Sequence, residues 1–97
     1  MANNPKQYVN RRWIDMDGYY VLQAFFYDDW REILRFCQNE EEKDLWIMSS
    51  KRMNIEVYYL IDVETLEEAK EEFESYYTEY LEDQLRYYED LLDAWEE

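Results

Sequence analysis

The sequence predicts an α+β domain in which an antiparallel sheet of about four strands is followed by a long acidic helix. Three observations predict this class. Short aromatic and β-branched segments recur through residues 7–61, an Asp-Gly pair divides the first two of them, and residues 64–97 carry apolar side chains at helical spacing. Since 97 residues suit one domain, we expect residues 1–97 to form a single α+β domain with 64–97 as its amphipathic helix.

The first two strands are expected at residues 7–14 and 19–26, joined by a hairpin turn at Asp15-Met16-Asp17-Gly18. Asp-Gly between two apolar runs is a strong short-range hairpin signal. A calcium loop starting at Asp15 is the alternative, but the later ligands and the closing glutamate do not follow at the required spacing. The hairpin is therefore preferred.

Residues 28–38 predict a short helix, because apolar side chains recur there at intervals of three and four. These are Trp30, Ile33, Leu34 and Cys37. Asp28 or Asp29 would cap this helix, and Cys37 would be a small core residue. A polar connection at 40–44 leads to two further strands, at 45–49 and 55–61, separated by a turn at 50–54. The element order is therefore ββαββα, typical of a sheet packed under helices.

The final helix is expected to begin at Asp62 or at Thr65, which forms a capping-box pattern with Glu68. A continuous helix over residues 64–97 would be about 51 Å long, whereas a compact domain of this size has a radius of gyration of about 12–13 Å. Either the helix breaks within residues 75–78 and folds back, or its distal end projects and exposes apolar side chains to a second copy or a target. The tyrosines at 77, 80 and 88 are assigned to the core, whereas core and contact surface stay equally open for Tyr87 and Trp95.

The net charge of −15 is concentrated in this helix. Residues 1–61 contain ten acidic and eight basic side chains, whereas residues 62–97 contain fifteen acidic and two basic ones. At about 100° per residue, the fourteen acids of 64–97 occupy one arc of roughly 180°, with one carboxylate per about 3.6 Å of helix. A DNA strand has one phosphate per about 3.4 Å. Such a field repels nucleic acid and anionic membranes and attracts basic proteins.

No enzyme signature is present. Gly18 is the only glycine, histidine is absent, and a single cysteine forms neither a zinc set nor an internal disulfide framework. We therefore expect a protein that is not an enzyme and uses no metal or cofactor. Without an apolar run of membrane-spanning length or a charged-then-apolar leader, a cytoplasmic location is expected.

The chain is similar in style to small acidic proteins of phages and mobile elements that mimic DNA to block host defence. The aromatic and acidic segment from Tyr80 to Glu97 carries this resemblance. It implies an anti-CRISPR or anti-restriction role inside a bacterial host cell, with carboxylates standing in for phosphates. Because that group shares no one fold, the resemblance implies nothing about residues 1–61.

Two functional hypotheses follow. The first is an inhibitor whose acidic helix occupies the basic nucleic-acid-binding groove of a CRISPR effector nuclease or a restriction enzyme, without binding nucleic acid itself. Its phosphate surrogates would be Glu67, Glu68, Glu71, Glu79, Glu82, Glu89, Asp90 and Asp93. A homodimer or the loop at 40–42 could supply a second acidic row. The second hypothesis is an oligomeric adaptor or immunity-type protein that binds one partner through an aromatic strip around Tyr87, Leu91 and Trp95.

Overall fold

The structure, a computed structural model, describes residues 10–96 and divides the chain into two compact units, Met1–Val63 and Glu64–Glu97. The elements are β1 (Arg11–Asp15), β2 (Tyr20–Phe26), β3 (Asp29–Gln38), β4 (Trp46–Ser50), β5 (Ile55–Leu60) and α1 (Leu66–Glu96). The α+β content is therefore confirmed, with a five-stranded antiparallel sheet in the first unit and one long helix in the second.

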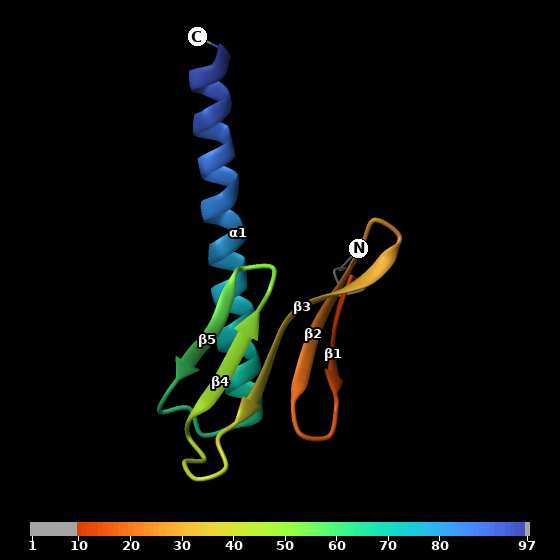
Figure 1. The fold of residues 1–97 in the computed structure, drawn as a ribbon, viewed down its shortest axis with the longest axis vertical. Helices are drawn as coiled ribbons and strands as arrows, with labels where there is room; N and C mark the ends of the chain where they lie inside the picture. Colours follow the sequence, from red (N-terminus) through yellow and green to blue (C-terminus); the bar gives the residue numbers. More distant parts are fainter. Residues whose placement is uncertain (1–9, 97) are drawn as a thin grey trace, which may run out of the picture. The chain divides into compact units, whose positions relative to one another are not determined.

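The five strands form a meander, in which each strand pairs antiparallel with the next one along the chain (Figure 1). Four strands lie where they are predicted, although residues 7–9 of the expected first strand lie outside the described residues. The hairpin between β1 and β2 is confirmed. Its turn is closed by the Met16 amide, which donates to the Tyr19 carbonyl at 2.8 Å, and by the Asp17 amide, which donates to Asp15 Oδ1 at 2.9 Å. The φ angle of +131° at Gly18 is one that side chains disfavour, which explains the glycine there.

One face of the sheet carries most of the buried side chains of the first unit. Leu22 lies opposite Leu34, and Phe36 lies opposite Met48. All four side chains are at most 3% exposed. Trp46 extends this row, with its ring in edge contact with Phe36 at 5.7 Å between centroids. Cross-strand pairs of this kind are the unit of sheet stabilisation.

The predicted short helix at 28–38 is wrong, because these residues form β3, the longest strand of the sheet. The apolar spacing that suggested a helix depends on two adjacent buried residues, Ile33 and Leu34. A regular strand alternates its side chains between faces, so two neighbouring buried residues break the period of two. Cys37 is half-buried on this strand, and its expected place in the core is not observed.

A β-bulge is the physical reason for this broken period. Leu22 on β2 lies opposite Leu34 on β3. The next pair along the strands is Gln23 and Glu32, so Ile33 has no residue of its own opposite it. A bulge places two residues against one and re-aims the side chains that follow. Both Ile33 and Leu34 are thereby buried, at 1% and 0% exposure.

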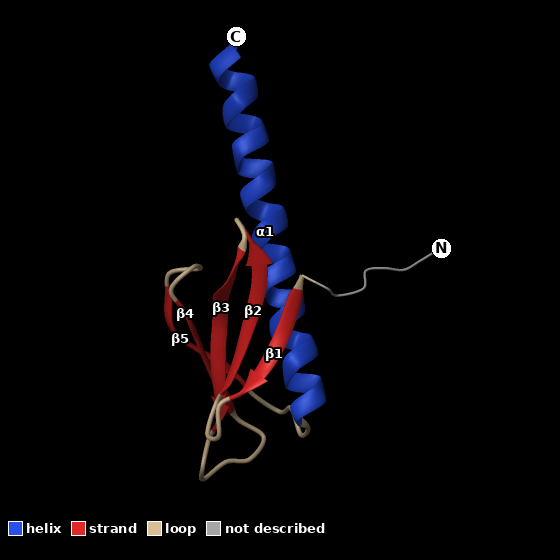
Figure 2. Ribbon diagram, turned by 90° about the vertical axis from the view of Figure 1, so that its right-hand side faces the viewer, coloured by secondary structure: helices blue, strands red, loops and turns tan. Residues whose placement is uncertain are grey.

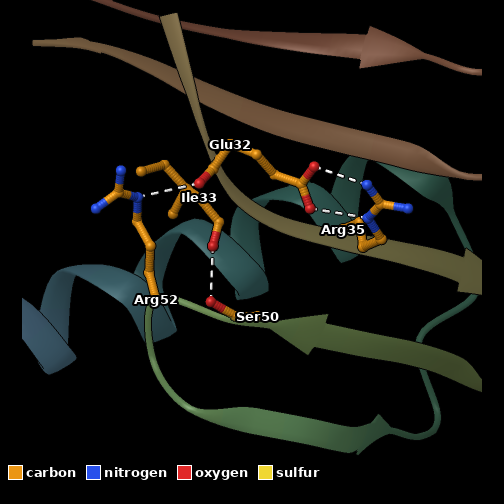
Figure 3. A network of polar contacts seen from close by, with 5 residues as sticks. All are labelled: Glu32, Ile33, Arg35, Ser50 and Arg52. Atoms are coloured by element: carbon orange, nitrogen blue, oxygen red, sulfur yellow. Dashed lines mark hydrogen bonds and ion pairs between the residues drawn. The ribbon is translucent and has the colours of Figure 1, made fainter.

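Side chains satisfy the backbone carbonyls at the bulge (Figure 3). Ser50 Oγ donates to the Ile33 carbonyl at 2.7 Å, and Arg52 Nε donates to the Glu32 carbonyl at 3.1 Å. The Arg35 guanidinium makes two hydrogen bonds to the Glu32 carboxylate, at 2.7 and 2.8 Å. This hydrogen bonding lowers the pKa of Glu32 and raises that of Arg35. The bulge is thus a stabilised feature of the sheet.

Helix α1 is continuous from Leu66 to Glu96, so the break expected as one alternative at 75–78 does not occur (Figure 2). Its start agrees with the predicted cap. Thr65 Oγ1 accepts a hydrogen bond from the Glu68 amide at 3.1 Å, and the Thr65 hydroxyl lies 3.2 Å from the Glu68 carboxylate. Thr78 Oγ1 donates to the Glu74 carbonyl at 2.9 Å without interrupting the helix.

Candidate partner-binding surface on helix α1

Helix α1 presents a dense row of carboxylates. Its 31 residues rise about 46 Å, and twelve of them are Asp or Glu. The mean interval is therefore about 3.9 Å along the axis, close to the phosphate interval of about 3.4 Å in a DNA strand. The carboxylates are not evenly spaced, however. They form three groups, within residues 67–74, 79–83 and 89–96, so the match to a nucleotide chain holds for the average only.

The three groups follow an 11-residue repeat that covers the helix. Residues 66–76, 77–87 and 88–96 align in register, and two positions of the repeat are acidic each time. The first position holds Glu68, Glu79 and Asp90, and the second holds Glu71, Glu82 and Asp93. Since 11 residues make slightly more than three helical turns, equivalent positions stay on one face and recur about every 16.5 Å. The spacing of the acidic residues along the sequence contains this repeat, whereas their angular positions around the helix axis do not show it.

We define the acidic face as these six residues together with Glu67 and Glu89. All eight side chains are exposed. Glu67 forms an ion pair with Lys70 at 3.8 Å, and Glu68 interacts with Thr65 at the start of the helix. The remaining six make no ion pair within residues 10–96. Their oxygens are therefore available to accept hydrogen bonds from lysine or arginine side chains of a partner.

Like charges on this face are close enough to repel one another. The two acidic positions of each repeat are three residues apart, as in Glu79 and Glu82, and such neighbours destabilise a helix by a few tenths of a kcal/mol per pair. The two basic residues of α1, Lys70 and Arg86, each form an ion pair with the residue three positions earlier. The repulsion along the rest of the acidic face is therefore not relieved within the helix.

Apolar side chains of the distal part of α1 are exposed. Trp95 is 85% exposed, and Tyr87 is 58% exposed. Tyr88 is also 58% exposed, so its assignment to the core is wrong. Tyr77 and Tyr80 are half-buried and stack on each other at 6.1 Å between ring centroids. Burial thus decreases toward the C-terminus, and the predicted contact residues Tyr87 and Trp95 are accessible.

The sheet carries a set of arginine–aromatic contacts that the sequence analysis missed. Arg12 lies over the Trp30 ring at 3.9 Å, and Arg35 lies over the Tyr19 ring at 4.9 Å. Both arginines also bond a neighbouring side chain, Gln23 for Arg12 and Glu32 for Arg35. Because Trp30 was assigned to a helix, no cross-strand relation with Arg12 could be foreseen.

A shallow hollow of about 570 Å³ lies beside the bulge, between β3, β4 and β5. Its charged lining includes the Glu32–Arg35 pair, whose charges neutralise each other, together with Lys51 and Glu56. Within residues 10–96 no group of three or more His, Cys, Asp or Glu side chains could hold a metal ion. In the same part of the chain, no helix is both long and apolar enough to cross a membrane.

Comparison of the chain with protein-family models, with curated proteins and with solved structures found no match. The acidic face and the exposed distal residues of α1 are therefore interpreted from their own geometry and charge.

Proposed function

We propose that this protein is a non-enzymatic inhibitor whose acidic face takes the place of a nucleic-acid backbone. Its partner is the basic nucleic-acid-binding groove of a defence nuclease, either a CRISPR effector nuclease, which is the first to test, or a restriction enzyme. The protein acts inside the bacterial host cell and binds no nucleic acid itself.

The observation that carries this proposal is the exposed acidic pair that recurs in every repeat of α1. Each pair offers two carboxylates about one helical turn apart, and a helix holds them at fixed relative positions. A groove lined by lysine and arginine binds phosphate oxygens through charge-assisted hydrogen bonds. Carboxylate oxygens accept the same bonds.

The unrelieved repulsion supports the same proposal. A helix that only had to fold would gain from lysine or arginine between its acids, yet α1 has only two basic residues. A basic groove would relieve this repulsion on binding. Association would then be fast, through electrostatic steering, and would weaken steeply as salt is raised.

The test is competition for the nuclease. Target DNA carrying a fluorescent label is bound to the nuclease, the protein is added, and release of DNA is followed by fluorescence anisotropy. We expect displacement by the native chain, and loss of displacement when Glu79, Glu82 and Glu89 are all replaced by lysine.

A matched control carries the same change of net charge on the first unit, outside α1. Glu42, Asp44 and Glu56 are exposed, and their side chains make no hydrogen bond or ion pair within the described part of the chain. Replacing these three by lysine should leave displacement close to that of the native chain. Equal losses in the two triple variants would show that net charge alone matters, and normal inhibition by the helix variant would refute the mimicry.

A second candidate function is favoured by the exposure of Trp95 and Tyr87. In it, the protein is an adaptor or immunity-type protein that recognises one partner through these side chains, since aromatic residues dominate interface hot spots. Trp95→Ala would then abolish binding, the helix lysine variant would bind normally, and affinity would change little with salt.

A further inference from the structure

The 11-residue repeat that places the acids also builds an apolar stripe along the other side of α1. Four positions of each repeat form it. The stripe comprises Leu66, Ala69, Lys70 and Phe73 in the first repeat, Tyr77, Tyr80, Leu81 and Gln84 in the second, and Tyr88, Leu91, Leu92 and Trp95 in the third. Only Lys70 and Gln84 are polar. Sustained apolar positions at this period are typical of helices that pack along their length against other helices.

Burial along the stripe changes from repeat to repeat. In the first repeat, Ala69 and Phe73 are completely buried. In the third repeat, the equivalent positions are Leu91 at 51% and Trp95 at 85% exposure. The stripe is therefore buried at one end of the helix and exposed at the other, where no side chain of residues 10–96 covers it.

We propose that the third repeat of this stripe, with the adjoining Leu81, Gln84 and Tyr87, is a self-association surface that packs against the same segment of a second copy of the chain. Two features select a second copy over a partner of another kind. They are the position of the charges and the area that would be buried.

The charges permit close approach of two equally acidic helices. No position of the stripe in its second and third repeats is charged, and the acidic face lies on the far side of the helix. Two packed helices have axes about 8–10 Å apart and diameters of about 10–12 Å each. Their outward acidic faces would be about 18–22 Å apart, more than twice the Debye length of about 8 Å at physiological salt. Repulsion between the copies is therefore strongly screened.

The exposed area is sufficient for a dimer. Tyr87, Tyr88 and Trp95 are 58%, 58% and 85% exposed. With about 150–250 Å² per aromatic side chain, they offer roughly 300–500 Å² per copy, or 600–1,000 Å² for two. Leucine side chains of the same segment add to this, since Leu91 and Leu92 are about half exposed. The total reaches the value of about 1,000 Å² that separates specific interfaces from incidental contacts.

Self-association would give the proposed inhibitor a second acidic row. Two helices packed through their stripes carry their acidic faces on opposite sides, at a separation comparable to the width of a nucleic-acid duplex. This consequence rests on the proposed function, whereas the association itself does not.

The experiment is sedimentation equilibrium of the full chain over a range of concentrations, at low and at high salt. We expect a reversible equilibrium between a species of 12.3 kDa and one of twice that mass. High salt should favour the larger species, because salt screens the repulsion between the two helices.

Two charge-matched variants locate the surface. Leu91→Glu adds a negative charge within the stripe and should raise the dimer dissociation constant by at least about tenfold. Ser75→Glu adds the same charge at an exposed position outside the stripe and should leave the constant within about twofold. Far-UV circular dichroism checks that both variants keep the helix. Trp95→Ala gives a second test, since a side chain 85% exposed contributes little to folding, and it should also weaken the dimer.

A chain that sediments at 12.3 kDa at every concentration in high salt would overturn the proposal. Equal weakening by Leu91→Glu and Ser75→Glu would overturn it as well, as would a monomer that binds an unrelated partner through Trp95. The two proposals fail separately, because a monomer could still displace DNA from a nuclease, and a dimer could form in a protein that displaces none.

Discussion

Ser50→Ala should destabilise the protein more than the same change at either of its other serines, Ser49 and Ser75. Ser50 is 2% exposed, and its Oγ makes two hydrogen bonds. It donates to the Ile33 carbonyl at 2.7 Å and accepts from the Met53 amide at 3.1 Å. Both partners belong to buried residues, so Ser50→Ala leaves two backbone groups unsatisfied. At about 1–3 kcal/mol for each such group, partly offset by relaxation, the expected loss is about 2–4 kcal/mol.

The assay is equilibrium unfolding in urea, followed by tryptophan fluorescence, because Trp46 lies in the core of the sheet unit. Ser49→Ala is the matched control. Ser49 is the preceding residue on β4, is only half-buried, and makes no side-chain hydrogen bond within the described residues. Its replacement should change the free energy of unfolding by less than about 0.5 kcal/mol. If the two variants differ by less than about 0.5 kcal/mol, the backbone at the bulge finds other partners and the role assigned to Ser50 is refuted.

Two further predictions concern charge and capping. The hydrogen bonds from Arg35 lower the pKa of Glu32, so this pair stabilises the fold above the ordinary pKa of 4.5 and ceases to do so as the pH falls through the lower folded-state pKa. Because both side chains are more than a third exposed, Glu32→Gln should lower the free energy of unfolding by less than about 1 kcal/mol at neutral pH. The difference in urea midpoint between this variant and the native chain should vanish in acid. A difference that stays constant at all pH values would contradict this. Thr65→Ala removes the cap of α1 and should lower the stability by about 1 kcal/mol, which is measured as faster amide exchange in the first helical turn. Thr78→Ala removes only a hydrogen bond to the carbonyl four residues earlier, so its effect on stability should be neutral or slightly favourable. Equal effects of the two threonine changes would refute the capping role.

The elements that the sequence predicts correctly are those specified by neighbouring residues. The turn at Asp17 and Gly18 needs positive φ angles, and these two residue types supply them. The cap at Thr65 needs only Glu68 three positions later. In both cases the interacting groups lie within one turn of chain, so local chemistry decides the structure.

The sequence-based predictions of secondary structure fail where residues distant in the sequence determine the structure. Apolar side chains at 30, 33 and 34 match a helix in isolation, but Ile33 and Leu34 are adjacent because β2 pairs around them and leaves one residue unpaired. The partners of the bulge, Ser50 and Arg52, follow it by about seventeen to twenty residues. No local pattern contains that information, and the strand could be distinguished from a helix only once its neighbours were known.

Burial on the helix was predicted incorrectly for a related reason. The helical spacing of apolar residues identifies the stripe of α1 that excludes charge, and within this stripe Phe73 is fully buried whereas Tyr88 is 58% exposed. The apolar spacing predicts which side of the helix can be buried, but it does not predict how far along the helix that side is buried. Exposure of the apolar stripe beyond Leu81 is a property of the folded chain that periodicity alone does not predict.

The two faces of α1 predict opposite responses to salt, and this opposition separates their roles. Binding through the acidic face replaces counterions by lysine and arginine, so its affinity falls as salt rises. Association through the apolar stripe brings like charges together, so its affinity rises with salt until screening is complete. Because one 11-residue repeat sets both faces, a variant such as Leu91→Glu can alter one response and leave the other in place. If dimerisation and nuclease binding both weakened as salt rises, the two processes would have to use the same carboxylates. That result would contradict the arrangement on α1, where Glu79, Glu82 and Asp90 lie on the side away from Tyr88 and Leu91.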